Sequence, residues 1–203
     1  MDHRPKGFVG RAWARLRRPS ATTSVLTLLL AGFGGGILFW GGFHTAVESS
    51  NSLEFCISCH EMRDNVYREY VQTIHYANRS GVRATCPDCH VPRDWLHKVT
   101  RKIQASGEVY HWLLGSVDTP EKFAAKRAEM AQRVWKRMKE TDSVECRNCH
   151  TTTAMSEEKQ TERAWRRHTK GVADGRTCID CHFGIAHTEP DGPGPQELFA
   201  TQD

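Results

Sequence analysis

All eight cysteines of this chain lie in four copies of one short pattern, in which two cysteines separated by two residues are followed directly by a histidine. The composition would produce roughly 0.02 copies by chance, so four copies are a specific signal, typical of c-type haem attachment. In that chemistry the two thiols bind the porphyrin and the adjacent imidazole ligates the iron. The four sites are Cys56, Cys59 and His60; Cys86, Cys89 and His90; Cys146, Cys149 and His150; and Cys178, Cys181 and His182.

Two other uses of the cysteines remain open. Two zinc sites of four thiolates each, or four short-range disulfides in an oxidising compartment, would also use all eight. Neither use requires a histidine directly after every second cysteine. The sequence therefore predicts four covalently bound c-type haems.

The N-terminal region predicts a membrane anchor. Residues 25–43 are uncharged and mainly apolar, and nineteen residues at about 1.5 Å each can cross a hydrocarbon core of about 30 Å. A cleavable signal peptide is the alternative, but no A-x-A-like cleavage site follows. We expect a basic cytoplasmic leader at 1–20, an uncleaved anchor at 21–47 and an exported remainder, by the positive-inside rule. In a bacterium this places the haem domain in the periplasm, on a single-pass protein of the inner membrane.

Charge and hydropathy exclude other classes of protein. The mean hydropathy is −0.59, too low for a polytopic membrane protein. Six of the 28 basic residues and one of the 24 acidic residues precede the apolar segment, which leaves 22 and 23 in residues 48–203. The exported part thus has no excess positive charge on which binding to nucleic acid could depend.

The exported part contains an internal repeat. The segments 75–90 and 168–182 share the order His, Gly, Arg, Thr, Cys, x, Asp, Cys, His. We therefore expect a mainly α fold with two dihaem units, at 48–115 and 141–190, in which the haems form the core. Residues 116–140 are predicted to be a connecting helix with an apolar stripe, and the proline-containing segment 191–203 is predicted to be a disordered tail.

The remaining histidines supply candidates for the second axial ligand of each iron. His75 and His168 occupy equivalent places in the repeat, and His187 closely follows the fourth motif, so we take these three as distal ligands. Histidines on a solvated surface are the alternative. His97 and His111 lack such support. One iron then needs a different ligand, for which Met62, two residues beyond His60, is a candidate.

These motifs resemble the NapC/NirT/NrfH family of tetrahaem quinol dehydrogenases. The resemblance rests on one anchor before four C-x-x-C-H motifs and on the phrases around 56–63 and 178–187, and it covers roughly residues 20–190. The phrases at 79–92 and 118–123 are closest to the NapC branch, which donates electrons to periplasmic nitrate reductase. The resemblance implies that membrane quinol is oxidised at the first haem and that electrons pass to a periplasmic reductase. That partner would be nitrate reductase with its small cytochrome subunit or, alternatively, another enzyme such as nitrite reductase.

The same resemblance suggests residues of the quinol site. Lys102 matches a lysine that lines the quinol pocket, and Glu108 falls near an aspartate beside the first iron. It also leaves open whether His60 or Met62 ligates that iron. Oxidation of a quinol releases two protons, so a carboxylate or a neutral amine nearby would serve as acceptor, and Asp94 is a further candidate.

Two other function classes remain in view. A terminal multihaem reductase would need an iron with an open position, and the supply of histidines argues against several of these. A haem-carrying scaffold protein would not need four permanently attached redox groups.

We predict that protein purified from a host that matures c-type cytochromes holds four haems per chain and no zinc. A pyridine haemochrome assay combined with metal analysis measures both quantities. Two or fewer haems per chain would contradict the interpretation of the four motifs.

Overall fold

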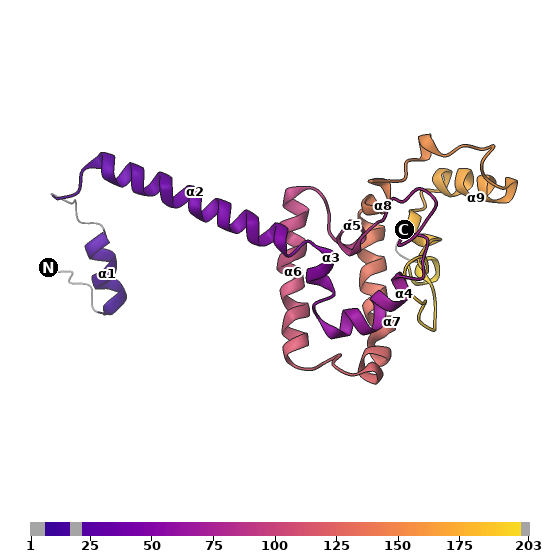
Figure 1. The fold of residues 1–203 in the computed structure, drawn as a ribbon, viewed down its shortest axis with the longest axis horizontal. Coiled ribbons are helices and arrows are strands. Elements are labelled where there is room, and N and C mark those ends of the chain that lie inside the picture. The colour runs from indigo at the N-terminus through magenta and orange to yellow at the C-terminus, as the bar shows by residue number, and fades with distance from the viewer. Residues whose placement is uncertain (1–6, 17–21, 200–203) are drawn as a thin grey trace. The chain divides into compact units, whose positions relative to one another are not determined.

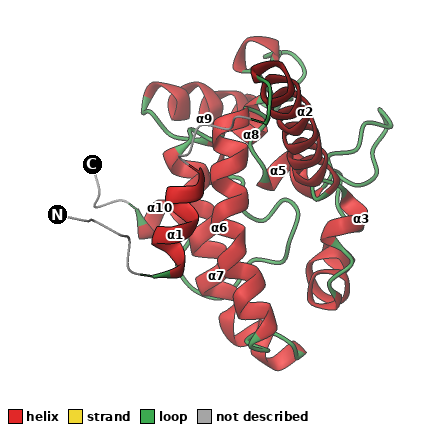
Figure 2. Ribbon diagram, turned by 90° about the vertical axis from the view of Figure 1, so that its left-hand side faces the viewer, coloured by secondary structure: helices red, strands yellow, loops and turns green. Residues whose placement is uncertain are grey.

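The computed structural model describes residues 7–16 and 22–199, and every regular element in these ranges is helical (Figures 1 and 2). The expectation of a mainly α protein is therefore confirmed. Parts of the predicted leader and tail, residues 1–6, 17–20 and 200–203, lie outside the described residues. The elements are α1 (Phe8–Leu16), α2 (Val25–Ser49), α3 (Leu53–Cys56), the π-helical η1 (Met62–Tyr67), α4 (Arg68–Tyr70), α5 (Cys86–His90), α6 (Trp95–Leu113), α7 (Pro120–Glu140), α8 (Val144–Arg147), η2 (Thr152–Ala154), α9 (Glu162–Ala173), η3 (Cys178–Asp180) and α10 (Pro195–Leu198).

The chain divides into two compact units, residues 1–46 and residues 47–203. The first unit contains most of α2, which has 25 residues and so a length of about 37 Å. Within the described residues, α2 is the one helix that is long and apolar enough to cross a membrane. Ser24 begins it, because its hydroxyl accepts a hydrogen bond from the backbone N–H of Thr27 at 3.2 Å. The helix starts four residues after the first residue of the predicted anchor and ends two residues after its last residue.

Two long helices, α6 and α7, form an antiparallel hairpin in the second unit (Figure 1). Asp94 caps α6 by accepting a hydrogen bond from His97 N, and Thr119 caps α7 by accepting one from Lys122 N. Pro120 follows in the first turn of α7, where its missing N–H costs nothing. The predicted connecting helix is thus present, but residues 116–119 belong to the turn before it.

One face of α7 packs against the fourth motif. The buried cluster consists of Trp135, Met138, Ile179 and Phe199. Met138 and its neighbour Val134 belong to the predicted apolar stripe of this helix, and Val134 packs against the cluster. The stripe is therefore a packing surface, as expected.

The prediction of a disordered tail is wrong for residues 195–199. Pro195–Leu198 form the short helix α10, and Phe199 directly after it is buried in the cluster. Gly194 N donates a hydrogen bond to Glu197 Oε2 at 3.2 Å. The proline-rich composition favoured disorder, but Pro195 occupies the first turn of a helix, and an aromatic anchor at 199 stabilises the segment through burial.

The second unit encloses little apolar material of its own. The buried hydrophobic residues in the described part of the chain are Val47, Tyr70, Phe123, Trp135, Met138, Ile179 and Phe199. Leu96 and Ile103 on α6, by contrast, are 71% and 68% exposed. A domain of this length ordinarily buries a larger core. Its interior therefore fits a fold that is completed by cofactors.

We predict that Phe199→Ala lowers the free energy of unfolding of the haem-loaded protein by about 3 kcal/mol, since it leaves a cavity beside Trp135. Urea unfolding followed by far-ultraviolet circular dichroism measures this change. Val172→Ala, at an exposed position on α9, is the control and should change stability by less than about 0.5 kcal/mol. Equal stability of Phe199→Ala and the parent chain would mean that the tail does not pack.

Candidate haem sites

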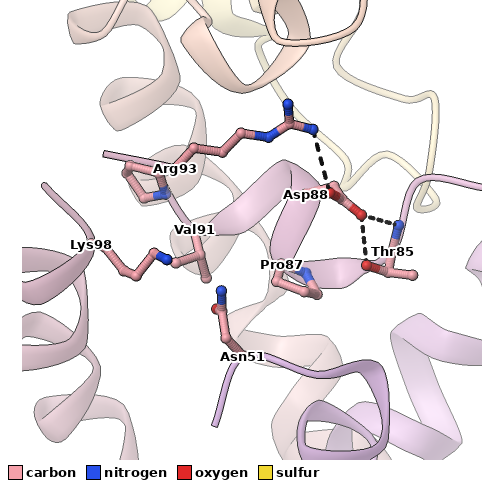
Figure 3. A pocket seen from close by; sticks show the side chains of 8 residues that line it. Asn51, Thr85, Pro87, Asp88, Val91, Arg93 and Lys98 are labelled. Carbon is pink, nitrogen blue, oxygen red and sulfur yellow. Dashed lines mark hydrogen bonds and ion pairs between the residues drawn. The ribbon is translucent and has the colours of Figure 1, made fainter. Parts of the chain in front are cut away.

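A capping box holds the second C-x-x-C-H motif in a helical turn (Figure 3). Asp88 Oδ2 accepts hydrogen bonds from Thr85 N at 2.8 Å and from Thr85 Oγ1 at 2.6 Å. Arg93 Nη2 lies 3.7 Å from Asp88 Oδ1. Helix α5 therefore has a defined start, and the capping box orients the turn that carries both cysteines and His90.

The fourth motif uses the same device. Asp180 Oδ2 accepts hydrogen bonds from Thr177 N at 2.8 Å and from Thr177 Oγ1 at 3.0 Å. Burial alone would raise the pKa of Asp180, but the hydrogen bonds from Thr177 and from Lys139 outweigh burial and lower it. The shared Thr and Asp of the sequence repeat thus have one structural role, which is to cap the turn that carries the haem cysteines.

The glycine shared by the two repeat segments is explained by its backbone conformation. Gly81 and Gly175 have φ angles of +73° and +69°, in the left-handed region that favours glycine. Each glycine turns the chain shortly before the capping threonine. The same turn therefore delivers the second and fourth motifs to their sites.

The four motifs lie next to one another in the order of the sequence. Cys86 lowers the pKa of the Cys56 thiol, and Cys146 lowers that of the Cys178 thiol, so the two cysteines of each pair are neighbours. Helices α5 and α8, which carry parts of the second and third motifs, are in contact. The sites therefore form one continuous row.

Three motif histidines face a second histidine. The ring centroids of His90 and His187 are 6.2 Å apart, and those of His168 and His182 are 5.8 Å apart. His75 and His150 face each other with their centroids 6.3 Å apart. The three histidines proposed as distal ligands are thus the three that the structure places opposite a motif histidine.

These separations fit an iron between the rings. A metal–imidazole bond is about 2.0 Å long, and the ring centre lies about 1.1 Å behind the nitrogen, so two axial rings stand about 6.2 Å apart. The observed pairs lie within about half an ångström of that value. The residues present therefore fit bis-histidine haems at the second, third and fourth motifs.

The protonation of these rings also suits ligation. Burial is the main cause that lowers the pKa of His75, His182 and His187. The pKa of His90 falls to about 3, again chiefly through burial. Neutral imidazole is the form that binds a metal. These four rings are therefore in the ligating form at neutral pH.

Two of the three histidine pairs join one half of the sequence repeat to the other. His187, from the second half, faces His90 of the second motif, while His75, from the first half, faces His150 of the third. Only His168 serves a motif of its own half. Residues 47–203 accordingly form one compact unit, so the two expected dihaem units are not separate domains.

The first motif has a different environment. His60 Nε2 lies 3.2 Å from Glu61 Oε1, and Glu61 is buried. No ring contact in the described part of the chain pairs His60 with another histidine. Met62 begins the π-helix η1 directly afterwards. This motif therefore lacks the opposed imidazole of the other three.

His97 and His111 lie apart from the motif histidines. His97 Nδ1 is 2.7 Å from Asp94 Oδ1, and His111 Nδ1 is 3.4 Å from Ser116 Oγ. Both residues are exposed. Asp94 is thereby engaged in capping α6 and in contacting His97.

Lys102 lies beside the first motif, whereas the carboxylate of Glu108 is bound to Arg101. Lys102 Nζ donates to the backbone oxygen of Ser50 at 2.8 Å, and its charge acts on Cys56. Glu108 is 66% exposed and accepts from Arg101 Nη2 at 2.7 Å. The carboxylate whose charge acts on Lys102 is instead Glu48, which accepts a hydrogen bond from Lys98 Nζ at 2.7 Å.

All eight thiols are free, so the structure contains none of the four short-range disulfides that were one alternative. Metal analysis of the purified protein tests the zinc alternative.

Comparison with known proteins decides the family. The model of the NapC/NirT cytochrome c family, N-terminal region, matches residues 18–192. This chain belongs to the NapC/NirT cytochrome c family. The resemblance drawn from the motifs is therefore confirmed.

Individual relatives of this cytochrome cover most of its length. It is 57% identical to the denitrification system component NirT of Stutzerimonas stutzeri, over 90% of this chain and 91% of the relative. It is 55% identical to the cytochrome c-type protein NapC of Escherichia coli K12, over 94% of both chains. The cytochrome c-type protein TorC of the same strain is 48% identical over 89% of this chain and 46% of its own length. The comparison with solved structures gave no significant match.

Sequence reasoning missed Glu48 because the residue lies at the end of the membrane helix, fifty positions from its partner Lys98. Its only signal was that it is the first charged residue after the apolar segment.

We predict that replacing His187 with Met changes the low-spin signal of one haem of this cytochrome, because the ring opposite His90 is lost. Electron paramagnetic resonance of the oxidised protein measures the signal. His97→Met is the matched control and should leave all signals unchanged, since within the described residues no ring contact pairs His97 with another histidine. Unchanged spectra in His187→Met, with four haems present, would end the assignment.

Proposed function

We propose that this protein is a membrane-anchored tetrahaem c-type cytochrome that oxidises membrane quinol and passes the electrons to a periplasmic reductase. The observation that carries the proposal is the continuous row of four attachment motifs, three of which have an imidazole pair at the spacing of an axially ligated iron. When bound, the haems supply one-electron redox chemistry. The polypeptide would hold the four haems in one row, with the first motif at one end and the fourth motif at the other.

The first motif supports the quinol end. Lys102 and Lys98 on α6 bind Ser50 and Glu48, which lie where the membrane helix α2 ends. Leu53–Cys56 then lead directly into the first motif. A quinol confined to the bilayer reaches this motif without leaving the membrane surface. The position therefore suits a lipid-soluble donor.

Lys102 has the properties needed near a group that loses protons. Burial is the main cause that lowers its pKa, and the charge of Glu48 opposes the shift. A lysine with a lowered pKa is more readily neutral, and a neutral amine accepts a proton from a hydroxyl group. Lys102 with Glu48 beside it can thus bind a quinol hydroxyl and receive its proton.

Glu108 is a weaker candidate than the sequence suggested. It follows Lys102 by six residues on α6, which rotates it about 240° around the helix axis. Its carboxylate is bound to Arg101 and largely exposed. We therefore assign proton transfer at the quinol end to Lys102 and Glu48.

The proposed topology has the leader in the cytoplasm, α2 across the inner membrane and residues from about 48 onward in the periplasm. The positive charge of the leader and the export of c-type haem domains support it. Either His60 or Met62 completes the first haem.

We infer two candidate electron acceptors from the relatives. Similarity to NapC supports periplasmic nitrate reductase with its small cytochrome subunit. Comparable similarity to NirT favours a second candidate, another periplasmic reductase such as nitrite reductase. Mixing the reduced cytochrome with each purified reductase and following haem reoxidation discriminates the two.

We predict that Lys102→Ala slows reduction of the haems by a quinol analogue by about tenfold or more, because a hydrogen-bond partner and proton acceptor is lost. Stopped-flow absorption of the haem bands measures this rate. Reduction by dithionite should be unchanged, since a small soluble donor does not need the site. Lys136→Ala, at an exposed position of α7, is the matched control and should keep the parent rate.

The two carboxylates test the location of the site. Glu48→Gln should slow quinol-dependent reduction, whereas Glu108→Gln should leave it near the parent rate. The reverse result would move the proton acceptor to Glu108. Parent rates in both Lys102→Ala and Glu48→Gln, with four haems bound, would overturn the site.

A further inference from the structure

Two arginines bring buried N–H groups together without an acceptor. Nε of Arg101 on α6, and Nε and Nη2 of Arg137 on α7, are buried and have no hydrogen-bond partner within the described residues. Arg101 donates from Nη2 to Glu108, and only 13% of its side chain is exposed. A buried donor without an acceptor costs about 1–3 kcal/mol, and more when it is charged. The region therefore lacks an acceptor.

Both guanidinium groups lie near the second motif. The positive charges of Arg137 and Arg101 contribute to the lowered pKa of His90, after burial and His187. Such effects weaken with distance, so each charge lies close to the His90 ring. His90 belongs to α5, and Lys98 of α6, three residues before Arg101, lines one pocket with Pro87 and Asp88 of α5 (Figure 3). Both guanidinium groups are therefore close enough to the second motif for their charges to act on it.

The two charges also act on each other. Burial is the main cause that lowers the pKa of Arg137, and the charge of Arg101 lowers it further, while Glu145 and Glu108 oppose the shift. Two neighbouring buried cations are unfavourable without an anion between them. The missing acceptor is therefore an anion.

No carboxylate of the described chain fills this role. Glu108 is exposed and forms its ion pair with Arg101. Glu145 is 4% exposed, and both its oxygens are buried without a hydrogen-bond partner, so it does not accept from Arg137. Haem itself carries two propionate carboxylates, and the planar guanidinium group binds carboxylates through paired hydrogen bonds.

We propose that Arg101 and Arg137 form a binding site for the propionates of the haem attached at Cys86 and Cys89. The inference rests on the proposed function only in requiring that this haem be present, not in requiring quinol oxidation. Two cations beside the propionates offset their negative charge and favour the ferrous form, which carries one positive charge fewer than the ferric form. The pair therefore raises the reduction potential of the second haem.

The test is a redox titration of the full, haem-loaded chain carrying Arg101→Gln or Arg137→Gln, followed by visible and electron paramagnetic resonance spectra. The second haem is identified as the one whose signal changes in His187→Met. Each variant should lower the potential of that haem, with a shift of about tenfold in its ferric-to-ferrous ratio at a fixed applied potential. Arg137→Lys keeps the charge and should retain most of the parent potential. Arg133→Gln, on an exposed part of α7, is the matched control and should change nothing.

Unchanged potentials in both Arg101→Gln and Arg137→Gln would overturn the proposal, as would equal shifts of all four haems. Repeating Arg137→Gln in a Glu145→Gln background tests the nearest competing partner. If the effect persists, the propionate remains the acceptor, and if it disappears, Glu145 is the partner and the proposal fails. If Arg137→Gln does not accumulate, Arg101→Gln alone decides. Altered potentials with no quinol oxidation would sink the proposed function and leave this site standing.

Discussion

The separation of about 6 Å between opposed imidazole rings is the constraint on which the rest of the domain depends. An axial pair tolerates little error in distance, so segments far apart in the sequence must be held in register. His187 is held through its neighbour Thr188, whose N–H donates to Glu69 Oε2 at 3.0 Å. Arg127 of α7 binds the same carboxylate. Three segments thus meet at one acceptor beside the ring.

Opposed histidine rings from the two halves of the repeat explain why the chain folds as one unit after residue 46. Each half lacks a ring that the other supplies, so neither half satisfies its own motifs. The apolar cluster around Trp135 adds a second link, because it joins α7, the fourth motif and the tail. With so small a core, covalent cofactors contribute directly to stability, as metals do in small metal-binding domains.

The charged residues near the first motif differ in type from those near the second motif. Lysines meet a carboxylate and a backbone oxygen where the membrane helix ends, which suits a site that handles protons. Arginines that remain permanently charged stand beside the second motif, where a fixed positive charge tunes a potential without exchanging protons. In the proposed function, proton handling is therefore confined to the membrane end, and the proposed arginine pair adjusts the next site electrostatically.

The sequence by itself determined the number and place of the haem motifs, the membrane helix and the family, because these depend on short patterns of residues. It also pointed to His75, His168 and His187, and the shared Thr and Asp of the repeat were visible before their capping role was known. Only the tertiary structure decided which rings face each other. Repeat symmetry would pair His75 with the motif that follows it, yet His75 faces His150. The burial of Phe199, the approach of Glu48 to α6 and the separation of Glu108 from Lys102 were likewise decided by tertiary structure. Each depends on how segments distant in the sequence pack together, and no local pattern encodes that packing.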